Sequence, residues 1–186
     1  MRHAQYRGKS LRTDKAGTQD QATGQDQATP EADSADIPAD SLYSQASIDE
    51  LLYMLEEEKL AGDIYEAFAT LYDVRIFDNI AASEDSHFDA LLNQAESLGI
   101  DVDAFVFQPA GTFVNAELQS IYDAFLADGS SSLEAALTVG VQIETKDITD
   151  IAEAAENVAD TPLEGVYENL LAGSEYHLAA FENLLV

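Results

Sequence analysis

Residues 47–99 read SIDELLYMLEEEKLAGDIYEAFATLYDVRIFDNIAASEDSHFDALLNQAESLG, and this stretch decides the fold. Apolar residues recur every three or four positions on both sides of Asp73, which is typical of two amphipathic helices. We predict helices over 47–72 and 75–98, the second of them ending at Gly99. Because only a few residues separate these helices, they must fold back on each other as an antiparallel hairpin.

The C-terminal part of the chain predicts a second helical hairpin. Apolar periodicity extends over 132–158 and 162–185, and a few residues around Asp160 join the two segments. Pro162 stands at the first helical position, where its missing N–H is harmless. Three of the predicted helix starts carry a capping box, which is a Ser or Thr followed three residues later by Glu: Ser47 with Glu50, Ser131 with Glu134, and Thr161 with Glu164.

The connection between the two hairpins decides the topology. It spans residues 99–131 and contains a shorter predicted helix over 115–128, so it is long enough to cross the bundle. Two helical hairpins joined by one long crossover form the ferritin-like arrangement. The sequence therefore predicts an all-α fold, an antiparallel four-helix bundle of ferritin-like type, over residues 46–186.

Residues 1–45 differ from the rest of the chain in composition. They are rich in Gln, Asp, Ala, Thr, Gly and Pro, and QDQAT occurs at 19–23 and again at 25–29. Such a segment cannot bury enough apolar surface to offset the entropy of the chain. We expect a disordered, low-complexity acidic tail.

The charge of the chain restricts its partners. Asp and Glu number 36 against 8 Lys and Arg, a formal net charge of -28. This charge repels nucleic-acid phosphates and anionic lipids, and no apolar run approaches the roughly 20 residues that span a bilayer. We predict a cytoplasmic protein without nucleic-acid or membrane partners, since a secretory apolar segment is also missing near the N-terminus. The scarcity of Lys predicts a halophilic host, where salt screens the repulsion.

Each predicted long helix has an apolar stripe that is interrupted near its middle by residues of metal-ligand type. These residues are Glu58 in the first helix, Glu84 and His87 in the second, Glu144 and Asp147 in the third, and His177 in the fourth. At about 1.5 Å per residue, their distances from the hairpin turns agree to within a turn or two. The six side chains should therefore meet at one level of the bundle.

Metal binding would explain why these residue types occur together. The chain has no cysteine, so metal ligands must be carboxylates or imidazoles, which iron and manganese both accept. The Glu84-x-x-His87 pair leaves one helix face, and four carboxylates would balance two divalent ions. Without metal, each buried carboxylate would cost several kcal/mol or become protonated.

Other interpretations of these residues remain open at this stage. A lone Glu-x-x-His pair is a weak signal, and a single histidine on an apolar stripe is more often a core residue than a ligand. Either Glu57 or Glu58 can face the core, and Lys146 can carry Asp147 to the surface. Tyr65 is either a core residue or a residue that orients a ligand. A metal-free structural bundle is the corresponding alternative for the whole chain.

Several motifs resemble known families. EKLAGDIY (58–65), IAASEDSHFDALL (80–92) and GVQIETKD (140–147) resemble the metal-carrying helices of rubrerythrin-type ferritin-like proteins. A closer resemblance, over about 47–185, is to an uncharacterised ferritin-like family, domain-of-unknown-function family 2202. The motifs that carry it, in order, are EEEKLA (56–61), SEDSH (83–87), NAELQSIYD (115–123) and GSEYHLAAF (173–181).

The resemblance to rubrerythrins implies a di-iron or di-manganese carboxylate protein that oxidises Fe(II) or reduces peroxide. It implies Glu58, Glu84, His87, Glu144 and His177 as ligands, with Asp147 as a weak or outer ligand. The chain departs from that pattern at Ser174, where rubrerythrins carry Glu, and it lacks their cysteine-ligated iron domain, so turnover would need an external electron donor. A metal buffer or store without turnover, assembled as a homo-oligomer, is the alternative.

Overall fold

The computed structural model describes residues 42–106 and 108–186, and in these ranges every regular element is a helix. The prediction of a disordered tail over 1–45 falls almost entirely outside the described residues. The helices are α1 (Gln45–Tyr72), α2 (Arg75–Ser97), α3 (Asp103–Val106), α4 (Ala116–Gly129), α5 (Leu133–Asn157) and α6 (Pro162–Glu182). None of the described helices combines the length and apolar character that crossing a membrane requires.

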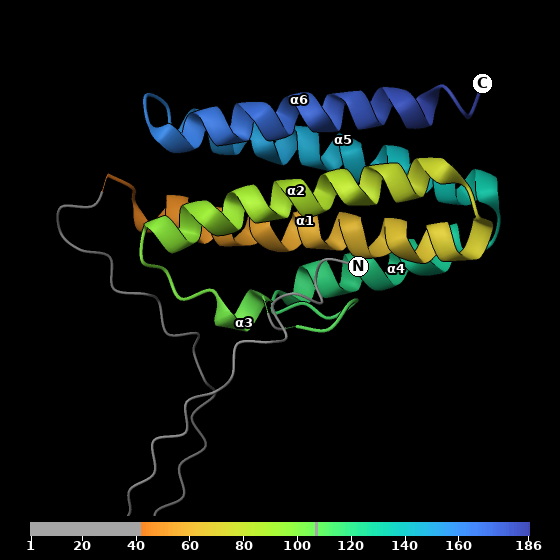
Figure 1. Ribbon diagram of the computed structural model, residues 1–186, viewed down its shortest axis with the longest axis horizontal. Coiled ribbons are helices and arrows are strands. Elements are labelled where there is room, and N and C mark those ends of the chain that lie inside the picture. Colours follow the sequence, from red (N-terminus) through yellow and green to blue (C-terminus); the bar gives the residue numbers. More distant parts are fainter. Residues whose placement is uncertain (1–41, 107) are drawn as a thin grey trace, which may run out of the picture. The chain divides into compact units, whose positions relative to one another are not determined.

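Four long helices form the body of the described structure. α1 and α2 pack along each other as one antiparallel hairpin, and α5 and α6 form the second (Figure 1). The hairpins meet through α1 against α5 and α2 against α6, while α4 packs outside on α1 and α5. The predicted all-α helical bundle is confirmed, and the crossover between the hairpins contains α4 as well as α3.

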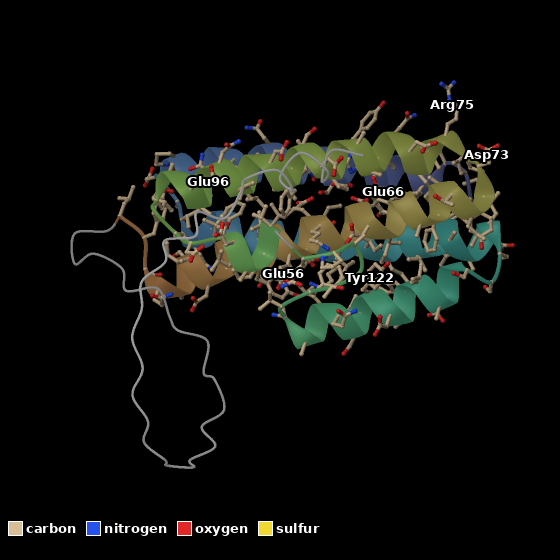
Figure 2. The ribbon with its side chains drawn as sticks, turned by 60° about the horizontal axis from the view of Figure 1, so that its bottom comes forward. Glu56, Glu66, Asp73, Arg75, Glu96 and Tyr122 are labelled. Carbon is tan, nitrogen blue, oxygen red and sulfur yellow. The ribbon has the colours of Figure 1, made fainter. Side chains whose placement is uncertain are left out.

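Both hairpin turns use an aspartate in the left-handed backbone region. Asp73 has φ 52° and Asp160 has φ 63°. This conformation reverses the chain within very few residues, and Asp tolerates it better than most residues do because its short side chain can bond locally. Figure 2 labels Asp73 and Arg75 at the turn between α1 and α2.

Two predicted capping boxes were wrong in position. α1 begins after Ser44, whose hydroxyl accepts a hydrogen bond from the N–H of Ser47, so Ser47 lies inside the helix. α5 begins after Ser132, which caps the N–H of Ala135, and Ser131 is not the cap. In both cases a second serine next to the predicted start has the extended backbone that an N-cap needs.

The start of α6 agrees with the prediction in position but differs in its hydrogen bonds. Thr161 is the N-cap residue, yet its hydroxyl donates to the carbonyl of Val158 and caps no helical N–H. The carboxylate of Glu164 accepts from the N–H of Asp160 at 2.8 Å. The one-turn helix α3 was not predicted, because four residues are too few for a periodic pattern.

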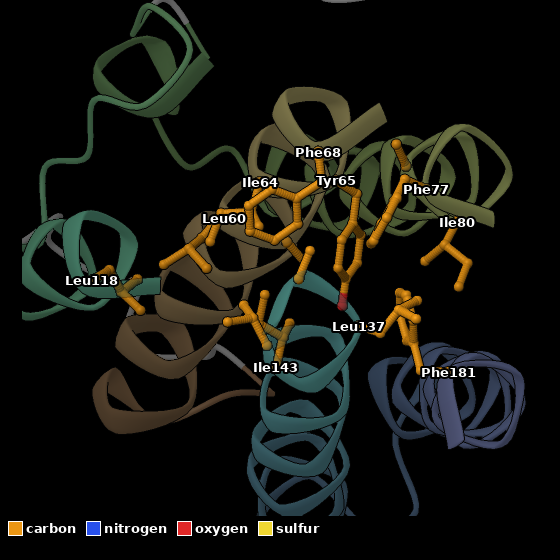
Figure 3. Packing of buried hydrophobic residues seen from close by; sticks show 14 of the residues in the cluster. Leu60, Ile64, Tyr65, Phe68, Phe77, Ile80, Leu118, Leu137, Ile143 and Phe181 are labelled. Atoms are coloured by element: carbon orange, nitrogen blue, oxygen red, sulfur yellow. The ribbon is translucent and has the colours of Figure 1, made fainter. Parts of the chain in front are cut away.

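Aromatic rings fill the core between the middle of the bundle and the α1–α2 turn (Figure 3). Tyr65, Phe68, Phe77 and Phe181 are fully buried, with ring centroids 5.2 Å apart for Tyr65 and Phe181 and 5.5 Å apart for Phe68 and Phe77. Such pairs stabilise by about 0.5–1.5 kcal/mol beyond the burial of their area. Figure 3 shows the Tyr65 hydroxyl directed toward α5.

Buried charges on α1 attach the crossover to the bundle. The carboxylate of Glu56 accepts from the backbone N–H groups of Val114 and Asn115 at 2.5 and 2.8 Å. Figure 2 shows Glu56 beside the segment that leads into α4. One helical turn along, Lys59 forms a buried ion pair with Asp63 at 2.6 Å and donates to two carbonyls of the same segment. These charges are therefore satisfied by the crossover and are not available to the bundle centre.

We predict opposite effects of alanine at two helical glycines. A Cβ atom at Gly129 would lie 2.1 Å from the ring of Phe68, which is fully buried and cannot move away. Gly129→Ala should lower the free energy of unfolding by about 1–3 kcal/mol through overpacking. Gly165→Ala, on an exposed part of α6 with open space around it, should raise that free energy by about 0.5–1 kcal/mol. Urea denaturation measures both, and equal stabilities would contradict the packing of α4 on α1.

Candidate metal centre

Five of the six predicted ligand residues come together between the four long helices, whereas Asp147 is buried on α5 but belongs to neither group of possible metal ligands. α1 supplies Glu58, α2 supplies Glu84 and His87, α5 supplies Glu144 and Asp147, and α6 supplies His177. The four carboxylate residues are at most 2% exposed, whereas the side chains of His87 and His177 are 12% and 8% exposed. The carboxylates thus lie inside, and the edges of the two histidine rings lie closest to solvent.

Two groups of three side chains share Glu84. The Nδ1 atom of His87 lies 2.8 Å from Oε2 of Glu84 and 3.1 Å from Oε2 of Glu58. The Nδ1 atom of His177 lies 2.9 Å from Oε1 of Glu84 and 3.5 Å from Oε2 of Glu144. Within each group, ligand atoms from all three residues lie within 4.8 Å of one another. Glu84 therefore offers one oxygen to each group, as a bridging carboxylate would.

The unpaired polar atoms of this centre fit bound cations. Buried atoms without a hydrogen-bond partner include both oxygens of Glu84, Oε2 of Glu144, both oxygens of Asp147 and Nδ1 of His177. Buried polar atoms in proteins nearly always have a partner, so a cluster of unpaired ones requires an explanation. The oxygens of Glu84 instead form ion-pair contacts with Nδ1 of His87 and Nδ1 of His177, at 2.8 and 2.9 Å. Two ligand atoms about 2.1 Å from one ion and at right angles to each other lie about 3 Å apart, which matches these contacts.

Burial raises the pKa values of three carboxyl groups in the centre. It raises the pKa of Glu58 to about 8, against the opposing hydrogen bond with His87, and the pKa of Glu144 to about 7, against the opposing contact with His177. Burial, together with the neighbouring carboxylates, raises the pKa of Asp147 well above its usual range. Removing a carboxylate from water disfavours its charged form, so without ions these groups retain protons.

The pKa shifts of the two histidines and of Glu84 favour the charged forms of these groups. Burial alone would lower the pKa of His87, but its contacts with Glu58 and Glu84 raise this pKa to about 10. Burial would likewise lower the pKa of His177, but contacts with Glu144 and Glu84 raise it to about 9. Burial would raise the pKa of Glu84, yet the two histidines prevail and lower it to about 2. Glu84 is thus an anion held between two imidazolium groups.

The sequence left open whether Glu57 or Glu58 faces the core, and the structure buries both. Glu58 contacts His87 on α2, whereas Glu57 forms an ion pair with Lys146 on α5 at 2.5 Å. Lys146 also contacts Asp150 and donates to the Tyr53 hydroxyl at 2.9 Å. Sequence reasoning missed this pair. Its one available signal was the presence of a lysine within a bundle that is nearly free of basic residues.

Asp147 is buried and does not lie on the surface. It is 1% exposed, and neither of its oxygens has a hydrogen-bond partner. Its neighbour Lys146 points away from it, toward Glu57, so the lysine does not carry Asp147 outward. Its charge interacts most strongly with those of Glu57 and Glu144, and it belongs to neither group of possible metal ligands.

Tyr65 and Ser174 complete the surroundings of the centre. The Tyr65 hydroxyl donates to Oε1 of Glu144 at 2.6 Å, which leaves Oε2 of Glu144 facing His177. This contact favours the interpretation of Tyr65 as a residue that orients Glu144. Ser174 is fully buried, and its hydroxyl donates to the carbonyl of Leu170 at 3.2 Å. Helix α6 therefore supplies His177 to the centre but no carboxylate.

Comparisons with known proteins identify the family. The family model described as "Uncharacterized protein domain (DUF2202)" matches residues 47–185. The chain belongs to the DUF2202 family. The resemblance to family 2202 that the sequence motifs indicate is thereby confirmed, and the family match covers the whole predicted centre.

A relative and a solved structure agree with this assignment. The uncharacterized protein MJ0754 of Methanocaldococcus jannaschii is 36% identical over 135 residues, which cover 73% of this chain and 72% of the relative. A crystal structure of hypothetical protein MJ0754 from Methanococcus jannaschii aligns with a TM-score of 0.74 at 33% identity. That alignment covers 81% of this chain and 85% of the crystallised one.

The pKa shifts predict that the metal-free protein loses stability as pH rises from 6 to 10. The folded centre holds protons on Glu58 and Glu144 up to pKa values of about 8 and 7, and on the histidines up to about 10 and 9. The unfolded chain releases them near 4.5 and 6.5, so their stabilisation is lost as pH passes the folded values. The lowered pKa of Glu84 has the opposite effect, since its stabilisation is lost as pH falls, but only below about pH 4.5.

Thermal unfolding of the metal-free protein at several pH values measures this dependence. His177→Gln should reduce the slope above pH 6.5, because it removes one of the raised pKa values. Glu175→Gln, an exposed carboxylate on the same helix, is the matched control and should keep the wild-type slope. A melting temperature that rises steadily across this range would contradict the protonation of the buried centre.

Proposed function

We propose that this chain is a ferritin-like metal-binding protein whose bundle holds two iron or manganese ions. The observation that carries the proposal is that the two carboxylate oxygens of Glu84 contact different histidines, one close to His87 and the other close to His177. The antiparallel bundle with one long crossover supports the proposal, because ferritin-like proteins build their metal sites in the core of this arrangement.

The ligand types suit iron or manganese and disfavour metals that require thiolate ligands. Four carboxylates and two imidazoles form a donor set of oxygen and nitrogen without any sulfur. The carboxylates carry four negative charges when ionised, which two divalent ions neutralise. This balance would replace the protons that the metal-free centre retains, so metal binding should release protons and strengthen with rising pH.

Each side chain has a distinct role in this proposal. Glu58 and His87 would hold one ion, Glu144 and His177 the other, and Glu84 would bridge them. Asp147 would be an additional weak ligand, and Tyr65 would fix Glu144 through its hydrogen bond. When bound, the ions would supply the redox chemistry for oxidising Fe(II) or reducing peroxide. Because the chain has no cysteine to hold a second redox centre, electrons would come from an external donor.

A second candidate is metal storage or buffering without turnover. The burial of the ligands favours it, since only the histidine edges approach solvent and bound ions would exchange slowly. In this case the protein, alone or as a homo-oligomer, would retain metal but oxidise Fe(II) no faster than buffer does.

We expect purified native protein to contain about two transition-metal ions per chain, in line with its carboxylate count. Fe(II) followed by peroxide should produce near-ultraviolet absorbance of Fe(III) carboxylate if the centre is redox-active. Glu84→Gln should lose both ions because both groups use Glu84, whereas Glu56→Gln, another buried glutamate, should keep them. Elemental analysis that finds less than half an equivalent in wild type would end the proposal, and bound metal without oxidation would select storage.

Glu144→Leu separates metal binding from a purely structural bundle. If the bundle is purely structural, replacing this buried carboxyl group by an apolar side chain should raise the melting temperature of the metal-free protein. Mn²⁺ should raise the melting temperature of wild type, because it binds only the folded state, and should raise that of the variant much less. Differential scanning calorimetry measures both quantities. An equal effect of Mn²⁺ on wild type and variant would show that the ion binds elsewhere.

A further inference from the structure

The ring of His87 lies between the carboxylates and the backbone of α6. Its Nδ1 atom faces Glu58 and Glu84, and the Cε1–Nε2 edge of the ring faces Gly173. A Cβ atom built on Gly173 would lie 2.6 Å from Nε2 and 2.7 Å from Cε1 of this ring. Real Cβ atoms essentially never come within 3.0 Å of another heavy atom, so the ring occupies the space of the missing side chain.

The ring cannot move deeper into the centre to make room for a side chain at residue 173. Nδ1 already lies at hydrogen-bond distance from both carboxylates, 2.8 and 3.1 Å away. One face of the ring lies against His177, with the ring centroids 5.6 Å apart and the planes inclined by 27°. A side chain at 173 would therefore rotate His87 outward and carry Nδ1 away from Glu58 and Glu84.

Gly173 differs in this respect from the other glycines of the described part of the chain. A Cβ atom at Gly62 would meet Glu84 only at an ordinary 3.6 Å, and one at Gly165 would meet nothing. Those at Gly111, Gly129 and Gly140 would approach Tyr122, Phe68 and Phe181, none of them a candidate ligand. Glycine inside a helix is less favourable than alanine, so its presence at 173 has a cost that the position of His87 explains.

We propose that Gly173 is a positioning residue of the metal centre. By leaving room for the His87 ring, it selects Nδ1 as the atom that faces the carboxylates and so completes the group of Glu58, Glu84 and His87. The second group does not need this space, because His177 reaches Glu84 and Glu144 from the next turn of α6. Even the smallest side chain at 173 removes one ion position and leaves the other. This inference rests on the proposed function.

Titration of the metal-free protein with Co²⁺ tests the inference. Bound metal is counted by elemental analysis after gel filtration, and the visible absorbance of Co²⁺ reports its coordination. Wild type and Gly165→Ala, the matched control on the same helix, should bind two ions, and Gly173→Ala should bind one. A wild type that binds none overturns the proposed function. A Gly173→Ala protein that binds two ions with the wild-type spectrum, or none at all, overturns this inference alone.

A stability measurement without metal tests the same contact independently. Gly173→Ala should lower the melting temperature of otherwise wild-type protein, because the new methyl group displaces His87. In a His87→Ala background the obstacle is gone, so the same substitution should raise the melting temperature through the better helix propensity of alanine. If Gly173→Ala lowers both melting temperatures equally, His87 is not the group that needs the space, and the inference fails.

Discussion

The contact on which the rest of the structure depends is that of Glu84 with two histidines from different helices. A carboxylate at the centre of a helical bundle is unfavourable unless positive charge or hydrogen-bond donors surround it. Glu84 obtains this surrounding from His87 on its own helix and from His177 on α6, which requires α2 and α6 to lie side by side at this level. This requirement restricts how far the two hairpins can slide along each other and which faces of α2 and α6 meet.

The neighbouring layers of the bundle separate this polar centre from other charges. On one side the aromatic core ends at Tyr65, whose ring packs on Phe181 and whose hydroxyl bonds Glu144, so one side chain belongs to both layers. On α1, the buried charges next to Glu58 find other partners, since Glu56 and Lys59 attach the crossover and Glu57 pairs with Lys146. A run of four charged residues inside a protein is thus divided among three different neighbours.

Protons neutralise much of the centre, and in the proposed function metal ions would replace them. The raised pKa values of Glu58, Glu144 and the histidines keep the cluster close to neutral when no ion is bound. Divalent ions would take the place of these protons, which links metal affinity to pH. Gly173 has no side chain, and this absence leaves the space beside α6 that the ring of His87 occupies.

The sequence by itself determined the helices, the two hairpins, the crossover and the approximate level at which five ligand-type residues meet, because helical periodicity fixes the face and height of each side chain. It did not determine that Glu57 and Glu58 are both buried, that Asp147 faces inward, or that Gly173 accommodates His87. Serines at neighbouring positions likewise left the true N-caps undecided. Only the tertiary structure decided these points, because partners on different helices depend on how closely and at what rotation the helices pack, which no single helix encodes.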